Sequence, residues 1–264
     1  MKNTISVIIP VHELNETTTK LFSNAVKSVE LQKSLPAELL IIVPKDSPAS
    51  KFMKDFDFSS IKNIVTIVEN EGETDFCSQF NLAVEKAKGE WVSLLEYDDE
   101  YANTWFRNVE IYQEAYPNVE LFLPIIIDVD ETNSFISFTN EAVWANSFSD
   151  ELGVLDNNAL LAYPNFNIDG MVIKKSLFSD FGGFKPSIKL TFIYEFLLRM
   201  TFKDVRTMVI PKFSYKHVTQ REGSLFHTYH KTMDQLEVNW WKSVAKKEYY
   251  FPKDRNITYN TQTT

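Results

Sequence analysis

Residues 91–101, WVSLLEYDDEY, join a short apolar segment to a run of acidic side chains. The apolar part, residues 91–95, has the length and composition of a buried strand. Carboxylates that follow a buried strand are costly to hold unless solvent, basic groups or a cation compensate their charge. Mg²⁺ and Mn²⁺ prefer such oxygen ligands and complete their shell with phosphate and water. The stretch therefore indicates a metal–diphosphate site, with a solvated acidic turn before the next helix as the alternative.

Further apolar segments precede this strand and alternate with amphipathic segments. We expect strands at residues 5–11, 39–43 and 63–68, and helices at residues 17–31 and 75–88. Strands that are apolar throughout and separated by helices are typical of a parallel sheet covered on both faces. Because ligands bind at the carboxyl ends of such strands, four loops are expected to meet in one crevice. These loops are residues 10–13, 44–47, 69–72 and 96–99.

The second half of the chain is less regular. We expect strands at residues 121–127, 166–173 and 205–210, the last ended by Pro211, and helices at residues 174–181 and 190–202. A single long helix is expected at residues 224–247, whereas residues 128–158 show too little periodicity for an assignment. No repeat or linker divides the chain. The predicted fold class is therefore α/β, with a mixed, mainly parallel sheet flanked by helices.

The composition is that of a folded protein of 264 residues, 44% hydrophobic and 24% charged. A single cysteine, Cys77, excludes an internal disulfide and a cysteine-built zinc site. No apolar run approaches the ~20 residues that span a bilayer, so we expect a cytoplasmic protein. The net charge of −9 disfavours an extensive grip on nucleic acid but leaves room for a local basic patch.

Several classes of nucleotide enzyme lack their required motif in this sequence. No Gly-x-Gly-x-x-Gly follows the first strand, as a dinucleotide oxidoreductase requires, and no Gly-Lys-Ser/Thr loop of a P-loop enzyme is present. The Gly-x-Ser-x-Gly turn of an α/β-hydrolase is also absent. A nucleotidyltransferase would share the sheet and the acidic metal site, but the sequence lacks its glycine-rich basic loop near the first strand.

A series of short motifs, in this order, resembles the family 2 glycosyltransferases over most of the chain. The motifs are SVIIPVHE at residues 6–13, AKGE at 87–90, EYDD at 96–99, GGF at 182–184 and EFLLRM at 195–200. The resemblance implies a GT-A (Rossmann-like) fold, inversion at the anomeric carbon, a Mn²⁺ or Mg²⁺ ion and a nucleotide diphosphate sugar donor, with a UDP-sugar favoured. It divides one continuous domain into a donor-binding half, residues 1–128, and an acceptor-binding half, residues 129–264.

The resemblance also assigns candidate site residues. Three metal ligands are expected: Asp98, Asp99 and His217. Contacts with the nucleotide and diphosphate are expected from Pro10, His12, Glu13, Asp46, Asn81, Glu96 and Arg221. The basic loop at residues 212–224 would stabilise charge on the leaving diphosphate, with an exposed loop of no such role as the alternative.

The sequence departs from the family pattern at the position of the catalytic base. The acidic pair expected before the helix arginine is replaced by apolar residues at 192–193. Glu195 is the first candidate for the base, with an ion pair to Arg199 four residues later as the structural alternative. Asp169 is the second candidate.

The prediction from sequence is thus a hexosyl- or pentosyltransferase that acts on an acceptor hydroxyl. A saccharide or glycoconjugate is the first choice of acceptor. A modified DNA base is the second, because the end of the chain weakly resembles glycosyltransferases of large-genome bacteriophages. The alternative is a GT-A nucleotide-sugar-binding module that has lost its chemistry, which the changes at residues 44–47 and 192–193 motivate. The retained acidic cluster favours the enzyme.

Overall fold

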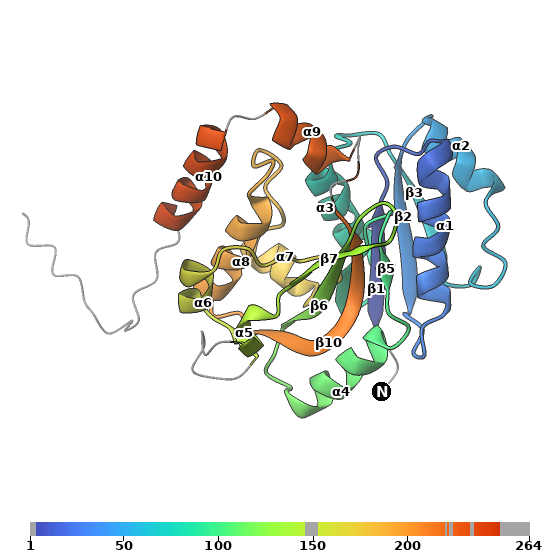
Figure 1. The fold of residues 1–264 in the computed structure, drawn as a ribbon. Coiled ribbons are helices and arrows are strands. Elements are labelled where there is room, and N and C mark those ends of the chain that lie inside the picture. The colour runs from blue at the N-terminus through green and yellow to red at the C-terminus, as the bar shows by residue number, and fades with distance from the viewer. Residues whose placement is uncertain (1–3, 146–152, 220, 222–223, 233–234, 249–264) are drawn as a thin grey trace, which may run out of the picture.

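The computed structural model describes residues 4–145, 153–219, 221, 224–232 and 235–248. Within this part of the chain, ten strands form one sheet in the order β3-β2-β1-β4-β9-β6-β10-β5, with β7 paired to β6 and β8 paired to β10. Helices lie on both faces of the sheet (Figure 1). The predicted α/β class is confirmed, and strands from both halves of the sequence share the sheet.

The first half of the chain builds the parallel part of the sheet. Its strands pair side by side in one direction: β1 (Ile5–Pro10), β2 (Glu38–Pro44), β3 (Val65–Asn70) and β4 (Trp91–Leu94). Every residue of β1 and β4 is buried, which explains why both segments are apolar along most of their length. Because β1 and β4 are parallel neighbours, the loops that follow them meet at the same edge of the sheet.

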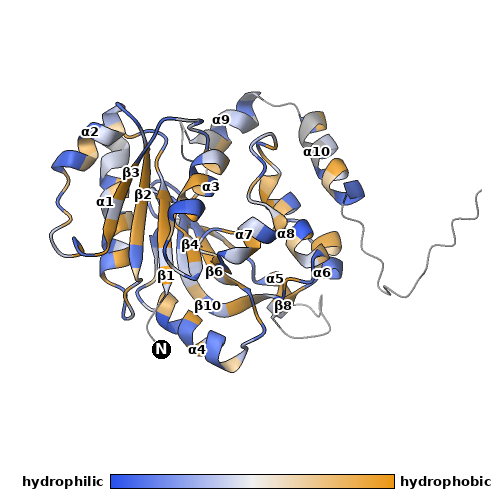
Figure 2. Ribbon diagram, turned by 180° about the vertical axis from the view of Figure 1, so that it is seen from behind, coloured by the Kyte–Doolittle hydropathy of each residue, from blue (hydrophilic) through white to orange (hydrophobic). Residues whose placement is uncertain are grey.

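Two helical layers cover this sheet. The first layer contains α1 (Glu16–Glu30) and α4 (Trp105–Ala115), and the second contains α3 (Phe76–Lys86) and α8 (Phe192–Phe202). Each layer packs against its own apolar cluster, and the apolar strands between the helices stand out in Figure 2. α2 (Pro48–Asp55) and α3 begin at Ser47 and Asp75, whose side chains accept a backbone hydrogen bond from the first turn.

The second half adds strands of both directions. β9 (Val172–Lys174) runs antiparallel to β4 and to β6 (Leu121–Val129), whereas β10 (Thr207–Val218) runs parallel to β6. Three shorter strands are antiparallel to these: β5 (Glu100–Tyr101), β7 (Phe135–Thr139) and β8 (Val154–Leu155). The remaining helices are α5 (Ala142–Ala145), α6 (Asn157–Ala162), α7 (Ser176–Phe181), α9 (Leu225–Thr232) and α10 (Gln235–Glu248).

The prediction that the strand at residues 205–210 ends at Pro211 is wrong. β10 continues to Val218, and its pairing with β6 shifts register between Ile210 and Phe213. A proline at such an irregularity interrupts no regular ladder hydrogen bond, so the strand tolerates it. The extension carries the end of β10 to the edge of the sheet where β4 ends.

Other predicted elements also differ from the structure. The single helix expected at residues 224–247 is two helices, α9 and α10. Residues 166–173 are a strand only from Val172, and residues 128–158 contain β7, α5 and β8. These short elements have little periodicity of their own, so tertiary pairing determines them. Among the helices described, none has both the length and the apolar character needed to cross a membrane.

Candidate functional site

The acidic residues after β4 lie in a buried corner of the molecule. The chain leaves β4 at Leu94 and passes through Glu96, Asp98 and Asp99 before it enters β5. Asp98 and Asp99 are buried, and Glu96 is half-buried. The backbone N–H of Asp99 donates to the Glu96 carbonyl at 3.2 Å, so this segment is a turn at the carboxyl end of β4.

Asp99 contacts the end of β10 through both carboxylate oxygens. Its Oδ1 accepts a hydrogen bond from the backbone N–H of Val218 at 2.8 Å, and its Oδ2 lies 3.0 Å from His217 Nδ1. Asp169 Oδ2 lies 3.6 Å from the same nitrogen. Ligand atoms of Asp99, Asp169 and His217 all lie within 4.8 Å of one another, so these three side chains could hold a metal ion.

The turn before β9 places Asp169. Gly170 follows it with a φ of 74°, and a Cβ there would lie 2.5 Å from the ring of Tyr215. Only glycine therefore fits between the turn and β10. The side-chain amide of Asn167 donates to the Asp169 carboxylate. Asp169 is thus held in a buried position beside His217.

Asp98 forms a separate contact with the segment that follows β10. Arg221 Nε donates to Asp98 Oδ2 at 2.8 Å, and Arg221 Nη2 donates to the hydroxyl of Tyr97 at 2.8 Å. The guanidinium also lies 5.6 Å from the centre of the Tyr97 ring. His12, which follows β1, meets the same ring edge-on with centroids 5.2 Å apart. The loops after β1, β4 and β10 therefore converge around Tyr97.

The electrostatics of this corner reflect an excess of buried acidic groups. Burial raises the pKa of Glu96 well above its usual range, and Asp169, Asp99 and Asp98 add to the effect. Burial also raises the pKa of Asp169, to about 6, although His217 opposes this shift. Close carboxylates of this kind favour a bound cation, because each repels the charge on the others.

Two cationic groups compensate part of this charge. Burial alone would lower the pKa of His217, but Asp99, Asp169 and Glu96 raise it well above its usual range. Burial and Asp99 raise the pKa of Asp98, and Arg221 opposes them. His12 behaves differently, because burial and the nearby Arg221 lower its pKa to about 4.

The carboxylates open onto a cavity of about 620 Å³. Its polar wall contains Glu96, Asp98, Asp169 and His217, and its apolar wall includes residues from α8 and α9. A much smaller pocket of about 20 Å³ adjoins it at Asp98 and has room for about one water molecule in this conformation. Its walls include Pro10, His12, Phe76, Tyr97, Arg221 and Phe226. The larger cavity has the size of a small-molecule site, and the carboxylates on its wall favour a bound cation.

The structure brings eight of the predicted site residues into this corner. They are Pro10, His12, Glu96, Asp98, Asp99, Asp169, His217 and Arg221. Glu13 and Asp46 are exposed after β1 and β2, with Asp46 at a φ of 55°. Their predicted contacts with a nucleotide stay predictions.

Asn81 has a structural role in this conformation. Its Nδ2 donates to the carbonyl of Phe184 at 2.8 Å, and its Oδ1 accepts from the N–H of Phe184 at 2.9 Å. A Cβ at Gly183 would lie 2.3 Å from Asn81 Oδ1, so the glycine permits this close approach. Each end of the amide makes one hydrogen bond, so Asn81 holds the turn at Phe184, and its predicted contact with the donor stays a prediction.

Glu195 also lies away from the acidic corner, in the interior of the α8 layer with 0% exposure. Arg199 Nε and Nη2 donate to its two carboxylate oxygens at 2.9 and 3.0 Å, and Lys185 Nζ lies 3.0 Å from Oε1. The ion pair that the sequence offers as the alternative is present. A carboxylate buried and paired in this way is not available to an acceptor hydroxyl, so the structure does not support Glu195 as the base.

Sequence reasoning missed Tyr97 and Asn167, which contact Arg221 and Asp169. The signal for Tyr97 was available, because it stands between the two acids of the EYD motif. Asn167 lies two residues before Asp169 in the stretch NFNIDG, but nothing in that stretch indicates which way its amide points.

The sequence matches no known protein family and no curated protein. Solved structures do match. A TarS fragment from S. aureus in complex with UDP-GlcNAc is 15% identical with a TM-score of 0.64, over 85% of this chain and 61% of that one. The mannosyltransferase PcManGT from Pyrobaculum calidifontis, in complex with GDP-Man and Mn²⁺, is 15% identical with a TM-score of 0.65, over 92% and 65%. The chain therefore has the GT-A fold and spans less than two thirds of either neighbour.

Proposed function

We propose that the protein is a metal-dependent glycosyltransferase that moves a sugar from a nucleoside diphosphate donor to an acceptor hydroxyl, with inversion. The observation that carries this proposal is the cluster of Asp99, Asp169 and His217 beside the carboxyl end of β4, with Asp98 on the wall of the adjoining cavity. Parallel α/β sheets bind ligands at this edge. The GT-A neighbours, which are nucleotide-sugar enzymes, support the reaction class.

The proposed nucleoside site is the small pocket beside His12 and Tyr97, which would have to widen from about 20 Å³ as Arg221 leaves Asp98 and Tyr97. The rings of His12 and Tyr97 offer faces and edges against which a base can stack. Because the His12 pKa is near 4, its imidazole is neutral at pH 7 and can accept or donate a hydrogen bond. A uridine diphosphate sugar is the favoured donor, as the resemblance to family 2 implies.

The acidic corner fits a divalent cation. Its carboxylates lie close to one another and to His217, and they repel one another. Carboxylate oxygens and an imidazole nitrogen are ligands that Mn²⁺ accepts. Asp98, Asp99 and His217 would hold the ion, which, when bound, would offset charge on the leaving diphosphate. Arg221 now neutralises Asp98. We propose that Arg221 turns to the diphosphate when the cation takes its place.

Asp169 is the proposed base. It lines the 620 Å³ cavity beside His217 and is held by Asn167. Its oxygens also lie close enough to Asp99 and His217 to reach a shared ion, and in the proposed division of roles Asp98 takes that place so that Asp169 serves as the base. An acceptor hydroxyl in this cavity would give its proton to Asp169 as the oxygen attacks the anomeric carbon. The acceptor proposed first is a saccharide.

The test is a screen of UDP- and GDP-sugars by thermal shift, with and without Mn²⁺, on the wild-type protein and on Asp98→Ala. We expect one donor to stabilise the wild type only with Mn²⁺, and Asp98→Ala to lose the effect. Asp169→Asn should retain the donor-dependent shift but lose sugar transfer. If no donor stabilises the folded protein with metal, the proposed function is wrong. Donor binding without transfer to any acceptor would favour the binding module that has lost its chemistry.

A further inference from the structure

Three phenylalanines form an exposed row on the outer face of β7, β6 and β10. Phe135, Phe138 and Phe213 are 58%, 41% and 56% exposed. The ring centroids of Phe135 and Phe138 lie 4.8 Å apart, and those of Phe138 and Phe213 also lie 4.8 Å apart in a stacked pair. The largest apolar patch on a folded domain is often functional, which makes this row a candidate binding surface.

The strand register places this row on the same face as two residues near the acidic corner. Phe138 pairs with Ile127, and Ile127 pairs with Lys216. Residues paired directly across neighbouring strands project from the same face of a sheet. Phe135 likewise pairs with Val129, and Val129 pairs with Val218. The aromatic row and the end of β10 therefore lie on the same face of these strands, with the buried Val129 between Phe135 and Val218.

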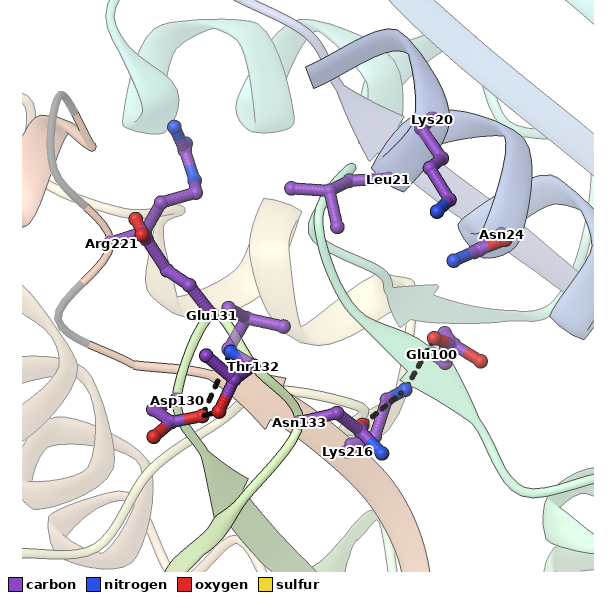
Figure 3. Close-up of a pocket in the computed structure, with 11 residues that line it drawn as sticks. Lys20, Leu21, Asn24, Glu100, Asp130, Glu131, Thr132, Asn133, Lys216 and Arg221 are labelled. Carbon is purple, nitrogen blue, oxygen red and sulfur yellow. Dashed lines mark hydrogen bonds and ion pairs between the residues drawn. The ribbon is translucent and has the colours of Figure 1, made fainter. Parts of the chain in front are cut away.

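Lys216 and Val218 line a cavity of about 470 Å³ between α1 and the turn that joins β6 to β7 (Figure 3). Lys20 and Asn24 of α1 line one side of this cavity above Glu100 and Lys216, and Arg221 and Glu131 lie across from α1 (Figure 3). Lys216 Nζ binds both Glu100 and the side chain of Asn133, which ties the turn to β10. The cavity wall is thus preformed.

The same cavity adjoins the catalytic corner. Val218 lines both this cavity and the one that contains Asp98 and Asp169, and Arg221 lines both this cavity and the nucleoside pocket. A chain-like ligand on the aromatic row would therefore lead through the α1 cavity to the carboxylates.

We propose that the row Phe135–Phe138–Phe213 and the α1 cavity form one binding track for a saccharide chain. The inference rests on the proposed function, in that the bound chain would be the acceptor. The apolar face of a sugar ring packs on an exposed phenyl ring, and the amides, hydroxyls and carboxylates of the cavity match sugar hydroxyls. Leu21 gives the cavity an apolar surface for a ring, as in other mixed sites.

Charge argues for a saccharide over a nucleic acid on this track. Aromatic rows can also stack bases, but such sites require a basic groove for the phosphates. Here three cationic side chains stand beside three acidic ones: Lys20, Lys216, Arg221, Glu100, Asp130 and Glu131. With no surplus of positive charge, the cavity does not offer the neutralisation that phosphates need.

Size argues against a second copy of this chain as the occupant. Three half-exposed phenyl rings present on the order of 300 Å². A stable interface buries roughly 800 Å² on each partner. The row is therefore too small to hold a dimer by itself, whereas it matches two or three sugar rings.

The experiment measures saccharide binding directly, without donor. The probe is an array of oligosaccharides of four to eight sugars, both neutral and uronic-acid-containing, followed by calorimetry on bound members. The test variant is Phe138→Ala/Phe213→Ala, and the matched control is Tyr116→Ala, an equally exposed aromatic residue after α4. We expect the double variant to bind at least tenfold more weakly and the control to bind as the wild type does.

Three results would overturn the track. The first is that no oligosaccharide binds, and the second is that the wild type and the double variant bind equally well. The third is that the double substitution abolishes binding of single-stranded DNA, or a dimer seen by light scattering, while saccharide binding is absent. The donor screen with Mn²⁺ separates these failures from failure of the proposed function. A metal-dependent donor shift that the double variant retains would leave the enzyme assignment intact while the track is rejected.

Discussion

Asp99 and His217 stand far apart in the sequence, yet Asp99 Oδ2 lies 3.0 Å from His217 Nδ1. The other oxygen of Asp99 accepts from the backbone N–H of Val218, so a single carboxylate fixes both the ring of His217 and the strand that carries it. A carboxylate that orients an imidazole in this way is a common feature of metal sites, because it sets the ring's tautomer and direction.

Replacement of Asp99 by Asn is expected to weaken Mn²⁺ binding about 10- to 100-fold. The amide can still accept one hydrogen bond, but it removes an anionic oxygen from the group that would hold the cation. Calorimetric titration with Mn²⁺ would measure the change. Asp57→Asn, at an exposed acid in the loop after α2, is the control and should bind Mn²⁺ as the wild type does. Equal Mn²⁺ affinity in Asp99→Asn would exclude Asp99 from the metal site.

Replacement of Arg221 by Gln is expected to destabilise the metal-free protein by about 3 kcal/mol. Asp98 would then lie buried with its strongest partner removed. If the cation takes the place of the guanidinium, Mn²⁺ should restore much of this loss. Urea unfolding with and without Mn²⁺ provides the measurement. A loss of the same size in both conditions would show that the ion does not bind at Asp98.

The parallel half of the fold could be predicted from the sequence because its signals are local. β1 and β4 are buried along their whole length, and the helices between the strands have a clear apolar period. The continuation of β10 past Pro211 could not be predicted, because it depends on a register shift against β6. The family resemblance groups Asp99 and His217 as metal ligands, but no local pattern predicts the strand extension that brings them together.

The roles of site residues could be predicted where the residues belong to one local motif. They could not be predicted where contacts between distant segments determine the role. The acids after β4 follow directly from WVSLLEYDDEY. Asn81 and Glu195 also match motif positions, but the first is bound to Phe184 and the second to Arg199. A motif records which residue types occur, and these contacts depend on how distant segments pack.

Replacement of Glu195 by Gln is expected to cost stability and to leave the transfer step unchanged. The substitution leaves Arg199 and Lys185 with a neutral partner in the α8 layer, at a cost of about 3 kcal/mol. Turnover per folded molecule should equal that of the wild type at a temperature where both are folded. Glu71→Gln, in the exposed pair with Lys45, is the matched control and should lose far less stability. A large fall in turnover by folded Glu195→Gln would restore Glu195 as a candidate base.

Acidification is expected to destabilise the fold through His12. The pKa of this imidazole is about 4 in the folded protein, against 6.5 in an unfolded chain, because of burial and the nearby Arg221. Between these values the unfolded state binds more protons, so the free energy of unfolding must fall as the pH drops from 6.5 towards 4. The full shift corresponds to about 3 kcal/mol, since each unit is worth roughly 1.4 kcal/mol.

Urea unfolding at pH 7, 6, 5 and 4.5 should show a shallower pH dependence for His12→Asn than for the wild type. The buried acids have raised pKa values and contribute with the opposite sign in both proteins, so the difference between the two curves isolates His12. Parallel curves would mean that the imidazole titrates in the folded protein as it does in the unfolded chain, and that its packing on Tyr97 does not keep it neutral.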